Sequence, residues 1–314
     1  MRNGALLSLG FLLAACAPVD PGTSTAASAS AAPSAPSEQE REIFYIGHSL
    51  MSDVPDMVEA LVETEGAEVE WQEQFILGAP LRWQWDQPSR GDDQFESTYQ
   101  TLYTDGITAE TTDLIVTDSV PRGSEAEVQE SIEYLGKFAE FAREKNPDVR
   151  IWYYETWHCI KSGTPKGCDY DTQSPTRHLP WRERIEKDAE MWRTIASDAA
   201  PEIRIIPVGQ ALGDLVDAAE AGEVPGFSTV EGFFDDDIHV NPYGKLFVAY
   251  VYVAAVFGID PVGLPYDITD RWGRSYWDTP NWQNKQWPEP DLAAVRKMQE
   301  VAREAVSEHL GQSD

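Results

Sequence analysis

A serine, an aspartate and a histidine in this sequence stand where they could cooperate in nucleophilic catalysis. Ser49 follows the apolar run "EIFYIG" (42–47), at the point where a buried strand would give way to a helix. A serine hydroxyl becomes a useful nucleophile only when a base lies within hydrogen-bond reach. Of the five histidines, His239 has a carboxylate three residues earlier, at Asp236. Such a carboxylate can hold Nδ1–H of the imidazole and leave Nε2 facing a hydroxyl, as an acyl-transfer triad requires.

Each of these positions also has a plain structural explanation. Serine is common in turns and at helix caps, and an acidic loop that leads into a helix would account for "DDDIH" (235–239) alone. Other histidines are weaker candidates for the base. His48 is the serine's neighbour, and adjacent side chains leaving a strand diverge. His309 lies in an amphipathic segment and is expected at the surface, and His158 has too few donors nearby for a zinc site.

Two motifs taken together are more specific than either alone. "GHSL" (47–50) and "DDIHVNPYG" (236–244) resemble block I and block V of the SGNH hydrolase superfamily, also called the GDSL esterase/lipase family. The resemblance spans roughly residues 42–262. It implies a three-layer α/β/α fold, Ser49 as nucleophile, His239 as base and Asp236 as its orienting partner. The usual block I aspartate is His48 here, which leaves the role of that side chain open.

The remaining blocks fit less closely. Gly78 in "FILGAP" (75–80) resembles the block II glycine, whose backbone N–H helps to bind the oxyanion; a simple turn glycine is the alternative. Block III should offer an asparagine, but the corresponding segment reads "VTDSVPRG" (116–123). An ionised Asp118 would repel an oxyanion, so the donor would be the Ser119 hydroxyl, a protonated Asp118 or backbone N–H groups. The expected oxyanion hole is formed by Ser49, Gly78 and Ser119.

The elements that must position these residues alternate between strands and helices. The continuous apolar run 42–47 predicts a strand, and further strand signals lie near 69–76 and at 113–117, 150–156 and 203–208. Apolar residues at helical spacing predict helices after Val54, after a Ser124/Glu127 capping box and across 185–196. Strands that lack polar alternation and alternate with helices indicate a parallel sheet covered on both faces. We expect an α/β fold: a three-layer α/β/α sandwich with a five-stranded, mainly parallel, flavodoxin-like sheet, with Ser49 at the carboxyl end of the first strand.

The first 38 residues are expected to lie outside this domain. Arg2, the apolar "ALLSLGFLLAA" (5–15) and the small residues before Cys16 form an export signal that is too short to span a bilayer. "LAAC" (13–16) resembles a bacterial lipobox, which implies cleavage before Cys16 and acylation of its thiol; a plain secretory signal is the alternative. The composition of 17–38, rich in Ala, Ser and Pro, predicts a disordered tether.

The predicted organisation therefore has four parts. These are a signal peptide (1–15), a lipidated Cys16 with its linker (16–38), an SGNH hydrolase-like domain (39–265) and a C-terminal extension (266–314) whose amphipathic helix packs on the domain. Cys159 and Cys168, which close the short loop "CIKSGTPKGC", are expected to form a disulfide that makes this loop a rigid wall of the site. Such a bond contributes roughly 2 to 3 kcal/mol.

Charge narrows the range of partners. The chain has a formal net charge of -30, and loss of residues 1–15 removes one positive residue, Arg2, which gives -31. This balance argues against nucleic acid and against electrostatic binding to anionic lipid, so a membrane link would depend on the lipid on Cys16. We expect a monomer anchored to a bacterial membrane, the outer membrane facing the periplasm.

These features predict a serine esterase that removes small acyl groups, acetyl in particular, from a small-molecule or glycan ester. Trp83, Trp85 and Trp157 lie near the motifs and would rim a pocket for sugar rings, although tryptophan is also common in cores. No phosphate loop or ligand cluster indicates a metal, nucleotide or redox cofactor. The alternatives are a lysophospholipase or thioesterase, and a catalytically degenerate carbohydrate-binding lipoprotein, which the altered block III would favour.

Overall fold

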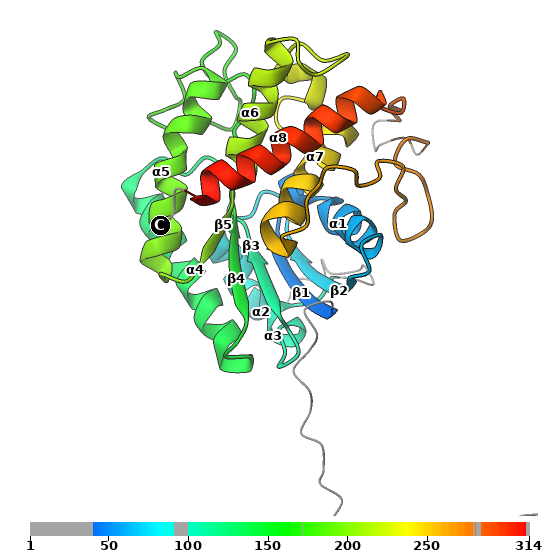
Figure 1. Cartoon of the computed structure of the whole chain (residues 1–314). Coiled ribbons are helices and arrows are strands. Elements are labelled where there is room, and N and C mark those ends of the chain that lie inside the picture. The colour runs from blue at the N-terminus through cyan, green and yellow to red at the C-terminus, as the bar shows by residue number, and fades with distance from the viewer. Residues whose placement is uncertain (1–39, 91–99, 172, 279, 281–283, 312–314) are drawn as a thin grey trace, which may run out of the picture. The chain divides into compact units, whose positions relative to one another are not determined.

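A five-stranded parallel sheet forms the centre of the part of the chain that the structure describes (Figure 1). The structure is a computed structural model of the whole chain; it describes residues 40–90, 100–171, 173–278, 280 and 284–311, which belong to one compact unit. The strands are β1 (Glu40–Gly47), β2 (Glu68–Phe75), β3 (Asp113–Val116), β4 (Arg150–Tyr154) and β5 (Arg204–Ile206). Their order is β2-β1-β3-β4-β5, the flavodoxin-like order. The expected fold class is confirmed.

The central strands are buried on both faces, and β1 shows why its sequence is apolar throughout. Successive side chains of a strand point to opposite faces of the sheet. Ile43 and Tyr45 join the core on one face, whereas Phe44 and Ile46 join a second core on the other. All four side chains are nearly inaccessible to solvent. A strand with polar alternation would have placed polar groups in one of these two cores.

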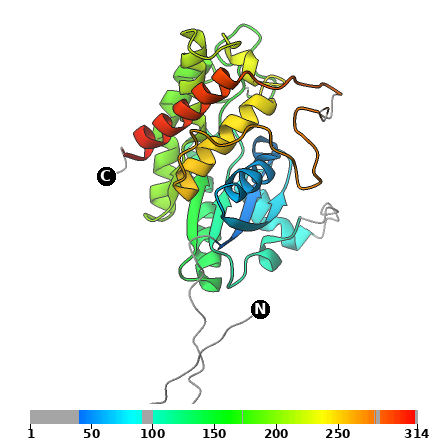
Figure 2. The ribbon, with the colours of Figure 1, turned by 45° about the vertical axis from the view of Figure 1, so that its right-hand side comes forward.

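Helices cover both faces of the sheet (Figures 1 and 2). The core that contains Ile43 is shared by α1 (Val54–Glu63), α6 (Val208–Glu220), α7 (Pro242–Tyr252) and α8 (Leu292–Gly311). The core that contains Phe44 is shared by α2 (Leu81–Arg90), α3 (Tyr103–Gly106) and α4 (Glu125–Lys145). Helix α5 (Trp181–Ala199) contributes residues to both cores. The short helical segments are η1 (Ser49–Met51), η2 (Val230–Phe233) and the π-helical η3 (Val253–Phe257).

Helix boundaries follow local capping chemistry. The predicted capping box is present at α4: the Ser124 hydroxyl accepts from Glu127 N–H at 3.3 Å, and the Glu127 carboxylate accepts from Ser124 N–H at 2.9 Å. The strand expected to reach residue 208 ends at Ile206 instead. Pro207 has no N–H to donate to the sheet and precedes α6, a helix that the sequence reading did not predict.

The C-terminal helix α8 packs on the rest of the unit. Its buried stripe lies against α6 and α7 and consists of Ala294, Val295, Met298, Val301, Ala302, Ala305 and Val306. The predicted signal peptide, Cys16 and the linker lie outside the described residues. Within the described ranges, no helix has both the length and the apolar character to cross a membrane.

Candidate active site

Ser49 lies where the first strand ends. β1 finishes at Gly47, and η1 begins at Ser49 with His48 as its N-cap. The turn is closed by the Met51 N–H, which donates to the carbonyl of His48 at 2.8 Å. Leu50 and Met51 enter the core, whereas Ser49 stays only half-buried. The turn therefore presents the serine hydroxyl at the carboxyl edge of the sheet, where ligands bind in folds of this kind.

His48 links the serine turn to the neighbouring strand β3. Its Nδ1 accepts from Leu50 N–H at 3.3 Å, and its Nε2 lies 2.9 Å from the carbonyl oxygen of Asp118. Because Nδ1 faces a donor and Nε2 faces an acceptor, the proton belongs on Nε2. Burial lowers the pKa of His48, which favours this neutral tautomer. Both ring nitrogens are occupied by backbone partners, so His48 holds the turn in place.

His239 and Asp236 complete a chain of hydrogen bonds to the serine. His239 Nε2 lies 3.0 Å from Ser49 Oγ, and His239 Nδ1 lies 2.8 Å from Asp236 Oδ2. The three side chains come from two regions 190 residues apart in sequence that meet at the sheet edge. The distances suit transfer of the hydroxyl proton to the imidazole.

Asp236 is held by the backbone of its own turn. Its Oδ1 accepts from the N–H groups of Ile238, at 2.8 Å, and His239, at 2.7 Å. Partial burial raises the pKa of the carboxyl, but these two N–H donors and the imidazole outweigh it and hold the pKa of Asp236 below its usual value. The carboxylate therefore stays ionised and keeps the proton of His239 on Nδ1.

Residues 235–239, the histidine turn, are followed by Asn241 and Pro242, which begin the next helix. Asn241 caps α7, since its side-chain oxygen accepts from the N–H groups of Tyr243, at 3.0 Å, and Gly244, at 3.1 Å. Its amide nitrogen donates to the carbonyl of Gly232 in η2 at 2.8 Å. Pro242 fits the first helical position, where no N–H donor is required. Both ends of the histidine turn are thus fixed to regular structure.

Two backbone N–H groups at this edge could stabilise an oxyanion. Gly78 lies in the turn after β2 with φ of 61°, in the left-handed region that favours glycine. The turn is attached to the serine strand, because Ile76 N–H donates to the carbonyl of Gly47 at 3.1 Å. Among the residues that the structure describes, the N–H groups of Ser49 and Gly78 have no hydrogen-bond acceptor.

Asp118, at the place of the missing asparagine, is fully buried and surrounded by donors. Its Oδ1 accepts from the N–H groups of Leu81, at 3.1 Å, and Ser119, at 2.8 Å, and forms an ion pair with Arg122 at 3.0 Å. Its Oδ2 lies 2.6 Å from the hydroxyl of Ser131. Both carboxyl oxygens of Asp118 therefore already have partners within the protein, which makes Asp118 a poor candidate for the oxyanion donor.

The Ser119 hydroxyl makes only a long contact among the residues that the structure describes. The backbone N–H of Ser119 donates to Asp118, and its Oγ lies 3.5 Å from Arg122, too long for a strong hydrogen bond.

Arg122 is the residue that sequence reasoning missed. It lies four residues after Asp118 and is also 3.4 Å from Glu130. An arginine near an unexpected aspartate was the available sequence signal for charge compensation.

The predicted disulfide between Cys159 and Cys168 is present. Beside it lies a groove of about 380 Å³ that is lined by both cysteines, Asp169, Tyr170, Asp236, Asp237 and Ile238. The Tyr170 side chain is 49% exposed. The disulfide loop therefore forms a wall next to the carboxylate of Asp236.

Expectations about three individual side chains are wrong. Trp157 does not rim a pocket: it is fully buried, and its Nε1 donates to the carbonyl of Ile238 at 2.7 Å. Trp85 stacks on Tyr103 at 5.0 Å between ring centroids, which leaves Trp83 as the exposed member of the three. His309 is not a free surface residue, because its Nε2 lies 2.9 Å from Asp214. In each case the exposure of the side chain is determined by the residues packed around it, which the residue type alone does not reveal.

His158 is buried and paired with Asp188, and within the described residues no group of three or more His, Cys, Asp or Glu side chains could hold a metal ion.

Comparisons with known proteins place the fold. No protein-family model and no curated protein matches this chain. A DUF4886 family protein from Bacteroides uniformis superposes with a TM-score of 0.62 at 14% sequence identity, covering 85% of this chain and 95% of that one. A structure described as a GDSL-like lipase from Parabacteroides merdae gives a TM-score of 0.44 at 12% identity, covering 68% and 94%. A carbohydrate esterase family 2 enzyme from Corynascus thermopiles gives 0.35 at 12% identity, covering 89% and 69%. The first of these likenesses shows a shared fold.

Proposed function

We propose that this chain is a serine esterase of the SGNH hydrolase type. The observation that carries the proposal is the continuous set of hydrogen bonds from Ser49 Oγ to His239 Nε2, at 3.0 Å, and from His239 Nδ1 to Asp236, at 2.8 Å. The geometry joins a nucleophile, a base and an orienting carboxylate at the sheet edge where such folds bind ligands. The motif resemblance of the sequence points to the same three residues.

The proposed reaction is acyl transfer in two steps. His239 Nε2 takes the proton of Ser49 as Oγ attacks the ester carbonyl, and the imidazolium returns this proton to the departing alcohol oxygen. Water then gives a proton to His239 and attacks the acyl-enzyme, which releases the acid and regenerates the serine hydroxyl. Asp236 stabilises the imidazolium in both steps and remains ionised.

The oxyanion of each tetrahedral intermediate would be held by donors that lack other acceptors. The N–H groups of Ser49 and Gly78 meet this condition among the described residues. The Ser119 hydroxyl would be the third donor, since Asp118 beside it is committed to Leu81, Arg122 and Ser131. This set replaces the asparagine amide of block III.

For the substrate we propose a small acyl group, acetyl in particular, on a sugar hydroxyl. The groove beside Asp236 supports the sugar, because Tyr170 offers a half-exposed aromatic face and the carboxylates of Asp169 and Asp237 can accept hydrogen bonds from hydroxyl groups. The carboxylate of Asp169 would repel an anionic head group, whereas that of Asp237 is paired with Lys166. This argues against a phospholipid as the preferred substrate.

A chromogenic acetate tests the activity. Replacement of Ser49 by alanine should abolish hydrolysis and leave the far-UV circular dichroism spectrum unchanged, and Asp236→Ala should reduce kcat less than His239→Ala does. Equal rates for the parent and the Ser49→Ala protein would show that another residue is the nucleophile. A series of nitrophenyl esters then tests the acyl part: turnover that peaks at eight carbons or longer would favour a lysophospholipase or thioesterase.

One observation favours a second candidate function, carbohydrate binding without catalysis. Asp118 stands where the family pattern has an oxyanion donor, which is a change that a non-catalytic relative would tolerate. A fluorophosphonate that labels reactive serines separates the two. Covalent labelling at Ser49, lost in the His239→Ala variant, supports an esterase, whereas an unreactive Ser49 together with glycan binding supports a binding protein.

A further inference from the structure

We propose that the segment from Trp157 to Cys168, which follows β4 and is closed by the disulfide, holds the imidazole of His239 in line with Ser49. Trp157 is the positioning residue of this segment. The inference rests on the proposed esterase function, since it explains how the base is kept in place. It assigns a positioning role to a buried tryptophan and to the disulfide, neither of which contacts Ser49 or His239 through a hydrogen bond described above.

Two hydrogen bonds join the segment to the backbone immediately before His239. Trp157 Nε1 donates to the carbonyl of Ile238 at 2.7 Å, and Ile160 N–H donates to the carbonyl of Asp237 at 2.8 Å. Their acceptors are the two consecutive peptide groups that lead into His239. The position of the imidazole therefore depends on donors in the segment from Trp157 to Cys168.

These donors are fixed by packing. Trp157 has no solvent exposure. Its ring packs edge-on against that of Phe234, the residue just before the histidine turn, with 6.3 Å between the ring centroids. Trp181 in α5 donates from its indole to the carbonyl of His158 at 2.9 Å and also packs edge-on against Phe234, at 6.0 Å. The segment is thus fixed to the sheet through β4 and to α5, and it transmits that rigidity to the turn.

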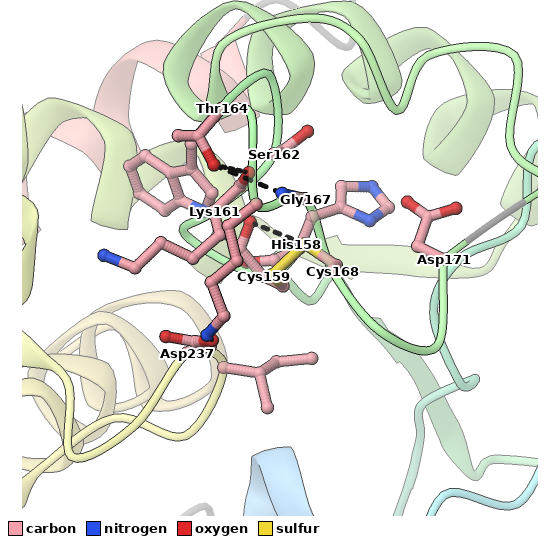
Figure 3. The surroundings of a disulfide bond; sticks show 12 residues. His158, Cys159, Lys161, Ser162, Thr164, Gly167, Cys168, Asp171 and Asp237 are labelled. Atoms are coloured by element: carbon pink, nitrogen blue, oxygen red, sulfur yellow. Dashed lines mark hydrogen bonds and ion pairs between the residues drawn. A yellow bond between two sulfur atoms is a disulfide. The ribbon is translucent and has the colours of Figure 1, made fainter.

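The disulfide holds the other end of the segment against the same turn (Figure 3). Cys159 and Cys168 join the two ends of the loop, and Lys166, two residues before Cys168, forms an ion pair with the Asp237 carboxylate. Lys161 pairs with Glu231 in η2 at 3.2 Å. Asp237 is therefore held at its backbone by Ile160 and at its side chain by Lys166. A free thiol pair would leave these two contacts independent of each other.

Alignment of the base has direct consequences for rate. The reaction requires His239 Nε2 at hydrogen-bond distance from Ser49 Oγ, and a misplacement of about 1 Å can lower a rate on the order of 100-fold. Residues 235–239 are bends: Asp235 N–H donates to the carbonyl of His239 at 2.8 Å beside the Phe234–Val240 bridge, and Lys285 donates to the Asp235 carboxylate at 3.0 Å. Removal of the Trp157 donor should therefore move the base, and a chromogenic acetate, which carries no sugar, reports this change without involving the groove that Asp237 and Ile238 line.

The test compares two tryptophan variants. Trp157→Phe keeps an aromatic ring in the core but removes the N–H donor to Ile238. Trp152→Phe is the matched control, because Trp152 is also buried and its indole donates at 2.9 Å to Asp113, at the opposite end of β3. For each protein the measurements are kcat and KM with a chromogenic acetate, the rate of Ser49 labelling by a fluorophosphonate, and the thermal midpoint.

For Trp157→Phe we expect kcat and the labelling rate to fall about 10-fold or more, with KM within about twofold of the parent value. Trp152→Phe should keep the parent's kcat and labelling rate. If the Trp157→Phe protein fails to fold, the Cys159→Ser/Cys168→Ser protein, compared with the parent, takes its place and should show the same loss of kcat. Parent-like kcat and labelling in whichever variant folds would overturn the inference. An unlabelled parent protein would instead contradict the proposed function.

Discussion

The carboxylate at position 118 determines how an oxyanion could be stabilised in this protein. An asparagine would donate from its amide, whereas Asp118 accepts from Leu81, Ser119 and Arg122. The Arg122 guanidinium, itself buried, compensates the negative charge that would otherwise act on the reacting carbonyl. Loss of one oxyanion donor costs about 2.7 to 4 kcal/mol of barrier in a serine protease. The Ser119 hydroxyl must supply that contribution if turnover is to be fast.

At the same scale, His48 predicts a pH dependence of stability. Burial lowers the pKa of His48 below the ordinary value of about 6.5, so the unfolded chain binds a proton at a higher pH than the folded one. The stabilisation from this residue is complete above pH 6.5 and is lost as the pH falls toward the folded pKa. The slope should be about 1.4 kcal/mol per pH unit.

Urea unfolding between pH 5.5 and 7.5 measures this slope. The free energy of unfolding of the His48→Asn protein should depend less steeply on pH than that of the parent. His178→Asn, at an exposed histidine, should leave this pH dependence unchanged. The comparison must be with the parent, because the pKa of His309 is raised by its hydrogen bond to Asp214 and acts in the opposite direction. Parallel curves for the parent and His48→Asn would exclude a neutral buried His48.

At the scale of elements, four parallel strands bring the candidate site together. β1 leads to Ser49, β2 to Gly78, β3 to Asp118 and β4 to the disulfide loop, and all four carboxyl ends lie along one edge of the sheet. The histidine turn lies before α7 in the sequence. It is held at this edge by hydrogen bonds from Trp157 and Ile160, in the segment that follows β4. The element that positions His239, the proposed base, is therefore a loop with a fixed packing partner.

The end of β4 also carries a buried acid that can be tested. Burial raises the pKa of Glu155 to about 7, although Gln210 donates to its carboxylate at 2.7 Å. The folded state thus favours the protonated form, and stability is lost as the pH rises from the unfolded value near 4.5 through about 7. Glu155→Gln keeps the acceptor for Gln210 and removes the charge, so it should stabilise the protein at pH 8 by on the order of 3 kcal/mol.

The same substitution should have little effect at pH 5, and this dependence on pH identifies the mechanism. Glu63→Gln, at an exposed position of α1, is the matched control and should be neutral at both pH values. Chemical denaturation at pH 5 and pH 8 provides the measurement. An equal stabilisation at both pH values would point to packing instead of charge.

Much of this arrangement could be predicted from sequence because it depends on local pattern. Strand signals in the sequence located all five strands, and the Ser124/Glu127 pair located the start of α4. The "GHSL" and "DDIH" segments named the serine, aspartate and histidine that lie together in the structure. Long-range packing could not be predicted: nothing in the residue type shows that Trp157 is buried under the histidine turn.

At the scale of the whole molecule, net charge governs how the protein can associate with a membrane. A formal charge of -30 opposes adsorption to anionic lipid, and no helix among the described residues is able to cross a bilayer. We propose that any attachment comes from a covalent lipid. The sequence offers one position for this, Cys16, at the end of a lipobox-like "LAAC".

The last prediction follows from this position. A bacterium that expresses the chain and grows on a labelled fatty acid should label the protein, and Cys16→Ser should abolish the label and move the protein to the soluble fraction. Because the lipid and not charge would provide the attachment, washing membranes with 1 M salt, where the Debye length is about 3 Å, should release none of the parent protein. Cys159 and Cys168 are joined in the disulfide, so they offer no alternative thiol. Unlabelled parent protein in the soluble fraction would show that residues 1–15 act as an ordinary secretory signal, and the proposed esterase would then work free of the membrane.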